Sequence, residues 1–184
     1  MQGQYEFFSR LASENGDGTG EVDAILDYST NPMEFIVRPS THVIMITRLL
    51  FGLRFSGNPQ SDTYGGVSLS GSEGMSILVR GDWGSFPLTS YNIQDIGDMK
   101  YQFFDFEPLE GAAGDNVYAG RYTPQKMKVK PNAPWDSLIY LYPDLNDELV
   151  IIWDGDFSSG SLIRNRVTVQ GRVHNAVGED GVSP

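Results

Sequence analysis

Apolar and polar residues alternate one by one through two long stretches of this chain, residues 41–55 and 163–174. In the second stretch the apolar residues Val167, Val169 and Val173 fall on one side of an extended chain, and polar residues fall between them. A period of two residues is typical of a β-strand with one buried face. The chain is therefore predicted to be a sheet protein.

Turn-forming residues separate the other candidate strands, because the chain contains 21 Gly and 10 Pro. About nine or ten short strands in this pattern indicate an antiparallel sandwich of two sheets, and a jelly roll is the commonest arrangement of so many strands. We expect an all-β fold with at most one short helix, at residues 90–99. The other predicted strands are residues 5–11, 34–38, 75–80, 101–107, 117–123, 126–130, 138–142 and 149–153.

The length of 184 residues suits a single domain with its own core. We expect the sandwich to occupy residues 1–175 and a polar C-terminal tail to occupy residues 176–184. The strand pattern predicts a core formed by Val43, Met45, Leu49, Phe51, Ile77, Val79, Phe104, Phe106, Leu138, Val150, Ile152, Val167 and Val169.

The charge and composition exclude several classes of protein. A net charge of -11 argues against nucleic acid as a partner, because binding to phosphates requires an excess of Lys and Arg. The absence of cysteine excludes disulfides, thiolate metal sites and cysteine nucleophiles. No apolar run approaches the ~18 residues of a membrane span, and we expect no contact with a membrane.

Groups that could carry catalysis or bind a metal do not form a convincing set. Oxygen-rich loops can bind calcium, but these loops lack the ligand spacing of a calcium loop and are expected to be solvated. Neither His42 nor His174 lies in a nucleophile motif, and paired carboxylates such as Asp105 and Glu107 occur at any acidic strand end. We therefore predict no enzyme activity, no metal and no cofactor. The acidic loops contain Asn15, Asp17 and Glu21, then Asp144, Asn146, Asp147 and Glu148, and finally Asp154 and Asp156.

Two tryptophans lie in segments rich in glycine and proline, where we expect them to be exposed. Trp83 and Trp135 could stack against sugar rings, since aromatic faces on a sandwich bind carbohydrate in this way. This feature supports an alternative function, a carbohydrate- or receptor-binding module.

Arginines gather on the polar sides of the two long alternating strands. Arg164, Arg166 and Arg172 share one face of the second stretch. Arg48 and Arg54 occupy the first stretch and are expected alongside them. In an acidic chain, such segregation could orient one subunit on another through charge complementarity. The alternative is that these arginines form local ion pairs within the sheet.

Two blocks of sequence carry a resemblance to a known family. The first is Thr47-Arg48-Leu49, and the second runs from residue 147 to residue 174 and contains Asp154, Asp156, Arg164, Arg166, Gln170 and Gly171. Together they resemble the small jelly-roll proteins of tailed-phage virions. The resemblance implies a head decoration or cement protein, or a related neck or tail part, without enzymatic activity.

A protein of that kind is made in the host cytoplasm and resides in the virion. Its expected partners are the major capsid protein or another virion protein, and it is expected to form a homo-oligomer, with a trimer among the candidate states. The sequence thus predicts a non-catalytic structural component, and the arginines are its candidate interface.

Overall fold

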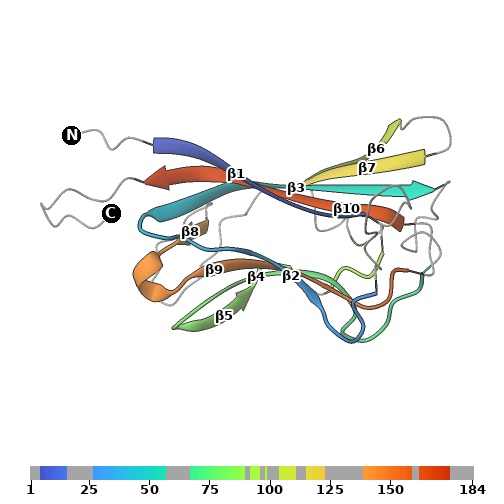
Figure 1. Cartoon of the computed structure of the whole chain (residues 1–184), viewed down its shortest axis with the longest axis horizontal. Helices are drawn as coiled ribbons and strands as arrows, with labels where there is room; N and C mark the ends of the chain where they lie inside the picture. Colours follow the sequence, from blue (N-terminus) through green and yellow to red (C-terminus); the bar gives the residue numbers. More distant parts are fainter. Residues whose placement is uncertain are drawn as a thin grey trace, which may run out of the picture.

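A computed structural model describes residues 5–15, 27–56, 67–89, 92–95, 98, 104–110, 115–122, 139–158 and 162–174. Two antiparallel sheets lie one above the other (Figure 1). The larger sheet has the strand order β1-β10-β3-β7-β6, with β8 also paired to β3, and the smaller sheet has the order β2-β9-β4-β5.

The strands and the single short helix of the described residues have the following bounds. The larger sheet consists of β1 (Tyr5–Asn15), β3 (Val43–Ser56), β6 (Phe104–Glu110), β7 (Asp115–Tyr122), β8 (Ile139–Leu141) and β10 (Leu162–His174). The smaller sheet consists of β2 (Met33–Val37), β4 (Gly74–Gly81), β5 (Gly84–Pro87) and β9 (Glu148–Asp154). A 3-10 helix, η1 (Pro143–Leu145), precedes β9.

The strand pairs are nested along the chain. The outermost pair is β1 with β10, followed by β2 with β9, β3 with β7, and β4 with β5. Successive pairs alternate between the larger and the smaller sheet. A long hairpin wound across two sheets in this way is a jelly roll, and β6 and β8 are additions to it. The predicted all-β, antiparallel, jelly-roll-like sandwich is confirmed.

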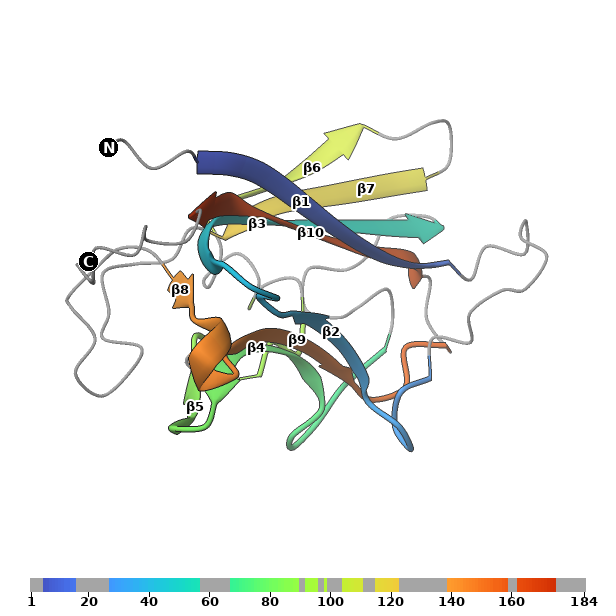
Figure 2. The same ribbon diagram turned by 60° about the vertical axis from the view of Figure 1, so that its left-hand side comes forward.

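The hydrophobic core fills the space between the two layers, which Figure 2 shows from a second direction. Each sheet contributes the side chains of its inner face, as expected when alternate residues point to opposite faces. The largest fully buried side chains are Trp153, Phe51 and Phe157. The rings of Trp153 and Phe157 meet edge to face at 5.4 Å between centroids.

A β-bulge in β3 changes which residues of that strand reach the core. Gln170 pairs with Arg48 while the next residue, Gly171, pairs with Ile46, so Thr47 is an extra residue on β3. Ile46 and Leu49 therefore both join the core, although unbroken alternation would place them on opposite faces. Of the predicted core positions, Val43 is only half-buried, and Met45 is buried but pairs with Arg172 outside the main core cluster, because alternation was counted across the bulge.

The face of β9 was also predicted wrongly. Leu149, Ile151 and Trp153 belong to the core, whereas Val150 and Ile152 occupy the outer face of the smaller sheet. Residues 149–153 are all apolar, so the strand itself contains no alternation that would identify its inner face.

The hairpin of β4 and β5 was not predicted. The turn between these strands consists of Asp82 and Trp83, and Gly84 follows with φ of 113°. The sequence 81–87 is short and rich in glycine, so its strand pattern is weak.

Several predictions lie outside the described residues, namely strand 126–130, Trp135, Leu138 and the tail 176–184. The helix predicted at 90–99 is wrong at residues 92–95, which are described and not helical, because Ile93 forms an antiparallel bridge with Met75. The division into a domain and a tail stays a prediction. In the ranges that the structure describes, no helix is long and apolar enough to cross a membrane.

Candidate functional site

The candidate site is the arginine face, defined as the outer side of β3 and β10 at Arg48, Arg54, Arg164, Arg166 and Arg172. The inner positions of β10 are buried, as at Val167 and Val169, so the residues between them belong to the outer side. Arg48, Arg166 and Arg172 are exposed. The two strands that were predicted to carry arginines are thus direct neighbours in the sheet.

The register brings the arginines of the two strands close together. Arg164 pairs with Arg54, and Arg48 pairs with Gln170. Directly opposed residues of antiparallel strands have Cβ atoms about 5 Å apart, and like charges at such positions destabilise a sheet. The register therefore concentrates positive charge on this part of the larger sheet.

Small residues surround Arg166 in the register. Its partner on β1 is Ser13, its partner on β3 is Gly52, and Gly52 pairs in turn with Ala119 on β7. A Cβ added at Gly52 would lie 3.8 Å from the Cβ of Arg166 and meet nothing closer. The residues of this row across the sheet therefore have small side chains, apart from Arg166.

The arginines of the smaller sheet have a different environment, which we call the ion-pair ladder. On its outer face Arg80 Nε donates to Glu148 at 2.8 Å, and Arg80 Nη2 donates to Glu34 at 3.0 Å. Arg38 also pairs with Glu148. In the part of the chain that the structure describes, neither Arg48 nor Arg166 forms an ion pair.

The ladder also covers apolar surface. In the register, Glu34 of β2 lies opposite Ile152 of β9, and Arg80 of β4 lies opposite Glu148 of β9. The ion pair between Arg80 and Glu34 therefore crosses β9 above Val150. Val150 is 0% exposed although it faces away from the core. The aliphatic part of an arginine side chain can shield apolar residues in this way.

The charges of the ladder shift the protonation equilibria of its members. Burial alone would raise the pKa of Glu148, but hydrogen bonds from Arg80 and Arg38 and their positive charges outweigh it, so the pKa is lowered. Hydrogen bonds to Glu34 and then to Glu148 raise the pKa of Arg80. Both shifts stabilise the charged forms that the ladder requires.

Trp83, a predicted sugar-stacking residue, has a role in the fold. Its side chain is half-buried against the core, and its Nε1 donates to Asp147 Oδ1 at 2.7 Å. The other oxygen of Asp147 accepts the backbone N–H of Tyr142 at 2.8 Å. A Cβ at Gly81 would lie 2.6 Å from Asp147 Oδ1, so only glycine fits beside this arrangement.

Asp147 is 1% exposed and was expected to be solvated in an acidic loop. Sequence reasoning missed its role because its partners lie 64 residues away at Trp83 and 5 residues away at Tyr142. The only available signal was its position between a short polar loop and the apolar strand β9.

Of the other predicted acidic loops, Asp17 and Glu21 lie outside the described residues, and Asp156 uses its carboxylate for a turn, as does the neighbouring Asp27. Asp27 accepts the backbone N–H of Ser29 at 3.1 Å, and Asp156 accepts that of Ser158 at 2.8 Å. Hydrogen bonds from Ser29 lower the pKa of Asp27. Among the described residues, no group of three or more His, Cys, Asp and Glu could hold a metal ion.

Comparison of the sequence and the structure with known proteins does not assign this chain to a family. No family model matches the sequence, and no curated protein matches it. The crystal structure of a serine protease of Aeromonas sobria is similar over 90% of this chain and 27% of that chain, with 12% identity and a TM-score of 0.25. A TM-score this low carries no argument, so the candidate site depends on its geometry alone.

Proposed function

We propose that this chain is a non-catalytic structural protein that binds other protein subunits through its arginine face, as a decoration or cement component of a phage virion. The observation that carries the proposal is the register of β3 and β10, which makes the two arginine-bearing strands direct neighbours and pairs position 164 with position 54. Arg48 and Arg166 are exposed there, without carboxylate partners among the described residues.

Arginine suits such a role chemically. Its planar guanidinium donates several hydrogen bonds in a fixed geometry and is weakly hydrated, so it is enriched at protein interfaces. Opposed arginines destabilise an isolated sheet, and a bound carboxylate removes that repulsion. An acidic protein surface would thus be the natural partner.

The setting of a virion follows from the resemblance of two sequence blocks. These blocks are neighbours in space, because Thr47 Oγ1 donates to the carbonyl oxygen of Gln170 at 3.3 Å. Thr47 and Gln170 thus meet in the larger sheet at the bulge, whereas Asp154, at the end of β9, belongs to the smaller sheet.

The test is the number of copies in purified phage particles. Particles made with the wild-type chain should contain it at a fixed stoichiometry by quantitative mass spectrometry. The triple variant R48E/R166E/R172E should lose at least about tenfold in occupancy, which corresponds to about 1.4 kcal/mol.

The matched control is K126E/K128E/K130E, which changes the net charge by the same amount. It should retain occupancy, and circular dichroism should show that both variants are folded. Absence of the wild-type chain from particles, or equal occupancy of both triple variants, would contradict the proposal.

The alternative of carbohydrate binding is weakened by the position of Trp83. The indole N–H of this residue is bonded to Asp147, and its ring packs against the core. Trp135 lies outside the described residues. A change in tryptophan fluorescence on titration with glycans would favour the alternative over our proposal.

A further inference from the structure

We infer that the arginine face binds a second copy of this chain, and that the two copies associate head to tail. This inference rests on the proposed function of the arginine face and names its occupant. It is argued from the distribution of charge, from the symmetry that like charges allow, and from the shape of the face.

The distribution of charge makes another copy a complementary partner. The whole chain has 13 Lys and Arg against 24 Asp and Glu, a net charge of -11. Without the five arginines of the face, 8 cations oppose 24 anions, a net charge of -16. The rest of a second copy, taken as a whole, is therefore strongly anionic. At physiological salt only charges within about 8 Å of the contact matter.

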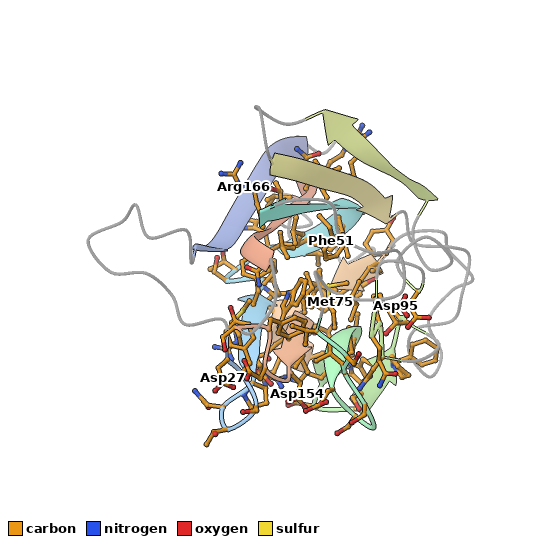
Figure 3. All side chains as sticks on the ribbon, turned by 90° about the vertical axis from the view of Figure 1, so that its right-hand side faces the viewer. Asp27, Phe51, Met75, Asp95, Asp154 and Arg166 are labelled. Carbon is orange, nitrogen blue, oxygen red and sulfur yellow. The ribbon has the colours of Figure 1, made fainter. Side chains whose placement is uncertain are left out.

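The two kinds of charge also lie apart in space. Figure 3 shows Arg166 on the side of the larger sheet and Asp27 and Asp154 on the side of the smaller sheet, whose strand β9 ends at Asp154. Asp27 is exposed and Asp154 is half-buried. A copy placed with the end that carries Asp27 and Asp154 toward the arginine face of the next would bring opposite charges together.

Symmetry then selects the kind of association. A twofold dimer through the arginine face would oppose arginines with arginines, which is unfavourable. The contact must join two different surfaces, and a contact of this kind repeats until it closes into a ring or continues as a filament. The inference therefore predicts assemblies larger than a dimer.

The row of small residues beside Arg166 allows close approach. Gly52 has neither a positive φ nor a crowded Cβ position, so the fold does not require glycine there. Glycine within a strand often marks a place where another backbone comes close. Because Gly52 has no side chain, another copy can approach the backbone of the sheet closely at this point of the arginine face.

Sedimentation velocity of the full chain over a range of concentrations tests the inference. We expect a concentration-dependent species larger than a dimer. In R48E/R166E/R172E the concentration at half-association should rise at least about tenfold, while K126E/K128E/K130E should behave as wild type. Gly52→Leu, which adds bulk without changing charge, should also weaken association.

A mixing experiment tests the head-to-tail geometry. The arginine variant keeps its acidic surfaces, so it can accept the arginine face of a wild-type copy but cannot extend the assembly. Excess variant should therefore shorten wild-type assemblies. Addition of the charge-matched control variant should leave them unchanged.

Four results would overturn the inference: a monomer at all concentrations, a closed twofold dimer, association that is insensitive to the arginine variant, or wild-type assemblies that excess variant leaves unchanged. Tight binding of a single-stranded DNA of about 20 nucleotides, lost in the arginine variant, would assign the face to nucleic acid instead. If the chain occupies particles but does not self-associate, only this inference fails. If it self-associates but is absent from particles, the proposed function fails.

Discussion

The outer faces of the two sheets use arginine in opposite ways. On the smaller sheet Arg80 lies between Glu34 and Glu148, and Arg38 shares Glu148. On the larger sheet the register partner of Arg48 is Gln170 and that of Arg164 is Arg54. The difference teaches that an alternating arginine pattern alone does not reveal a role, because the role depends on the residue across the strand.

This comparison predicts that charges of the smaller sheet contribute to folding and that charges of the larger sheet do not. The largest effect is expected at Asp147, next to the ladder. Asp147→Ala removes the acceptor of Trp83 Nε1 and of the Tyr142 N–H, and should lower the free energy of unfolding by about 3 kcal/mol. Urea unfolding measures it.

The matched control for that change is Asp144→Ala in the same loop. Asp144 is exposed, so its replacement should change stability by less than about 0.5 kcal/mol. Equal losses in the two variants would show that the loop as a whole, and not the buried carboxylate, stabilises the end of the smaller sheet.

The next effect is expected in the ladder itself. Glu148→Ala leaves Arg38 and Arg80 without their shared partner and should lower the free energy of unfolding by about 1–2 kcal/mol, since the arginine ends are partly screened by water. Glu34→Ala removes one pair and should lower it by about half as much. A larger loss of stability for Glu34→Ala than for Glu148→Ala would contradict the role of Glu148 as the shared partner of the two arginines.

The contribution of Glu148 should depend on pH. Its folded pKa lies below the unfolded value of about 4.3, so its stabilisation is fully present above the unfolded pKa and is lost as pH falls through the folded pKa. The stability difference between wild type and Glu148→Gln should therefore be constant from neutral pH to about pH 5 and shrink below it. A difference that grows on acidification would contradict the assigned shift.

The smallest effect is expected at Gly52 on the larger sheet. Gly52→Ala should raise the free energy of unfolding by about 0.5 kcal/mol, because alanine restricts the unfolded chain and its Cβ has room beside Arg166. Thermal unfolding below the association concentration measures it. A loss of stability would mean that the fold requires glycine at this position.

Much of this architecture could be predicted because half-buried strands alternate. The strands that carry Arg48 and Arg166, and the jelly roll that contains them, follow from the period of two residues. The bulge at Thr47 could not be predicted, because one added residue changes the face of the strand without changing its composition. In β9 the sequence contains no alternation, because residues 149–153 are all apolar, so the inner face of this strand could not be predicted.

The charged contacts were harder to predict than the strands. Strand β10 contains arginines at alternating positions and β4 contains Arg80, but only the register shows that Arg80 meets Glu148 and that Arg164 meets Arg54. The role of Asp147 depends on Trp83, which is distant in sequence. Pairings of this kind follow from topology, which local patterns do not contain.

The central claim is that the arginines of the larger sheet serve contacts between molecules while those of the smaller sheet serve the fold. Urea unfolding of Arg48→Gln/Arg166→Gln beside Arg80→Gln, at concentrations where the chain is monomeric, tests it most directly. We predict that the double variant stays within about 0.5 kcal/mol of wild type while Arg80→Gln loses about 1–2 kcal/mol. An equal or greater loss in the double variant would contradict the claim.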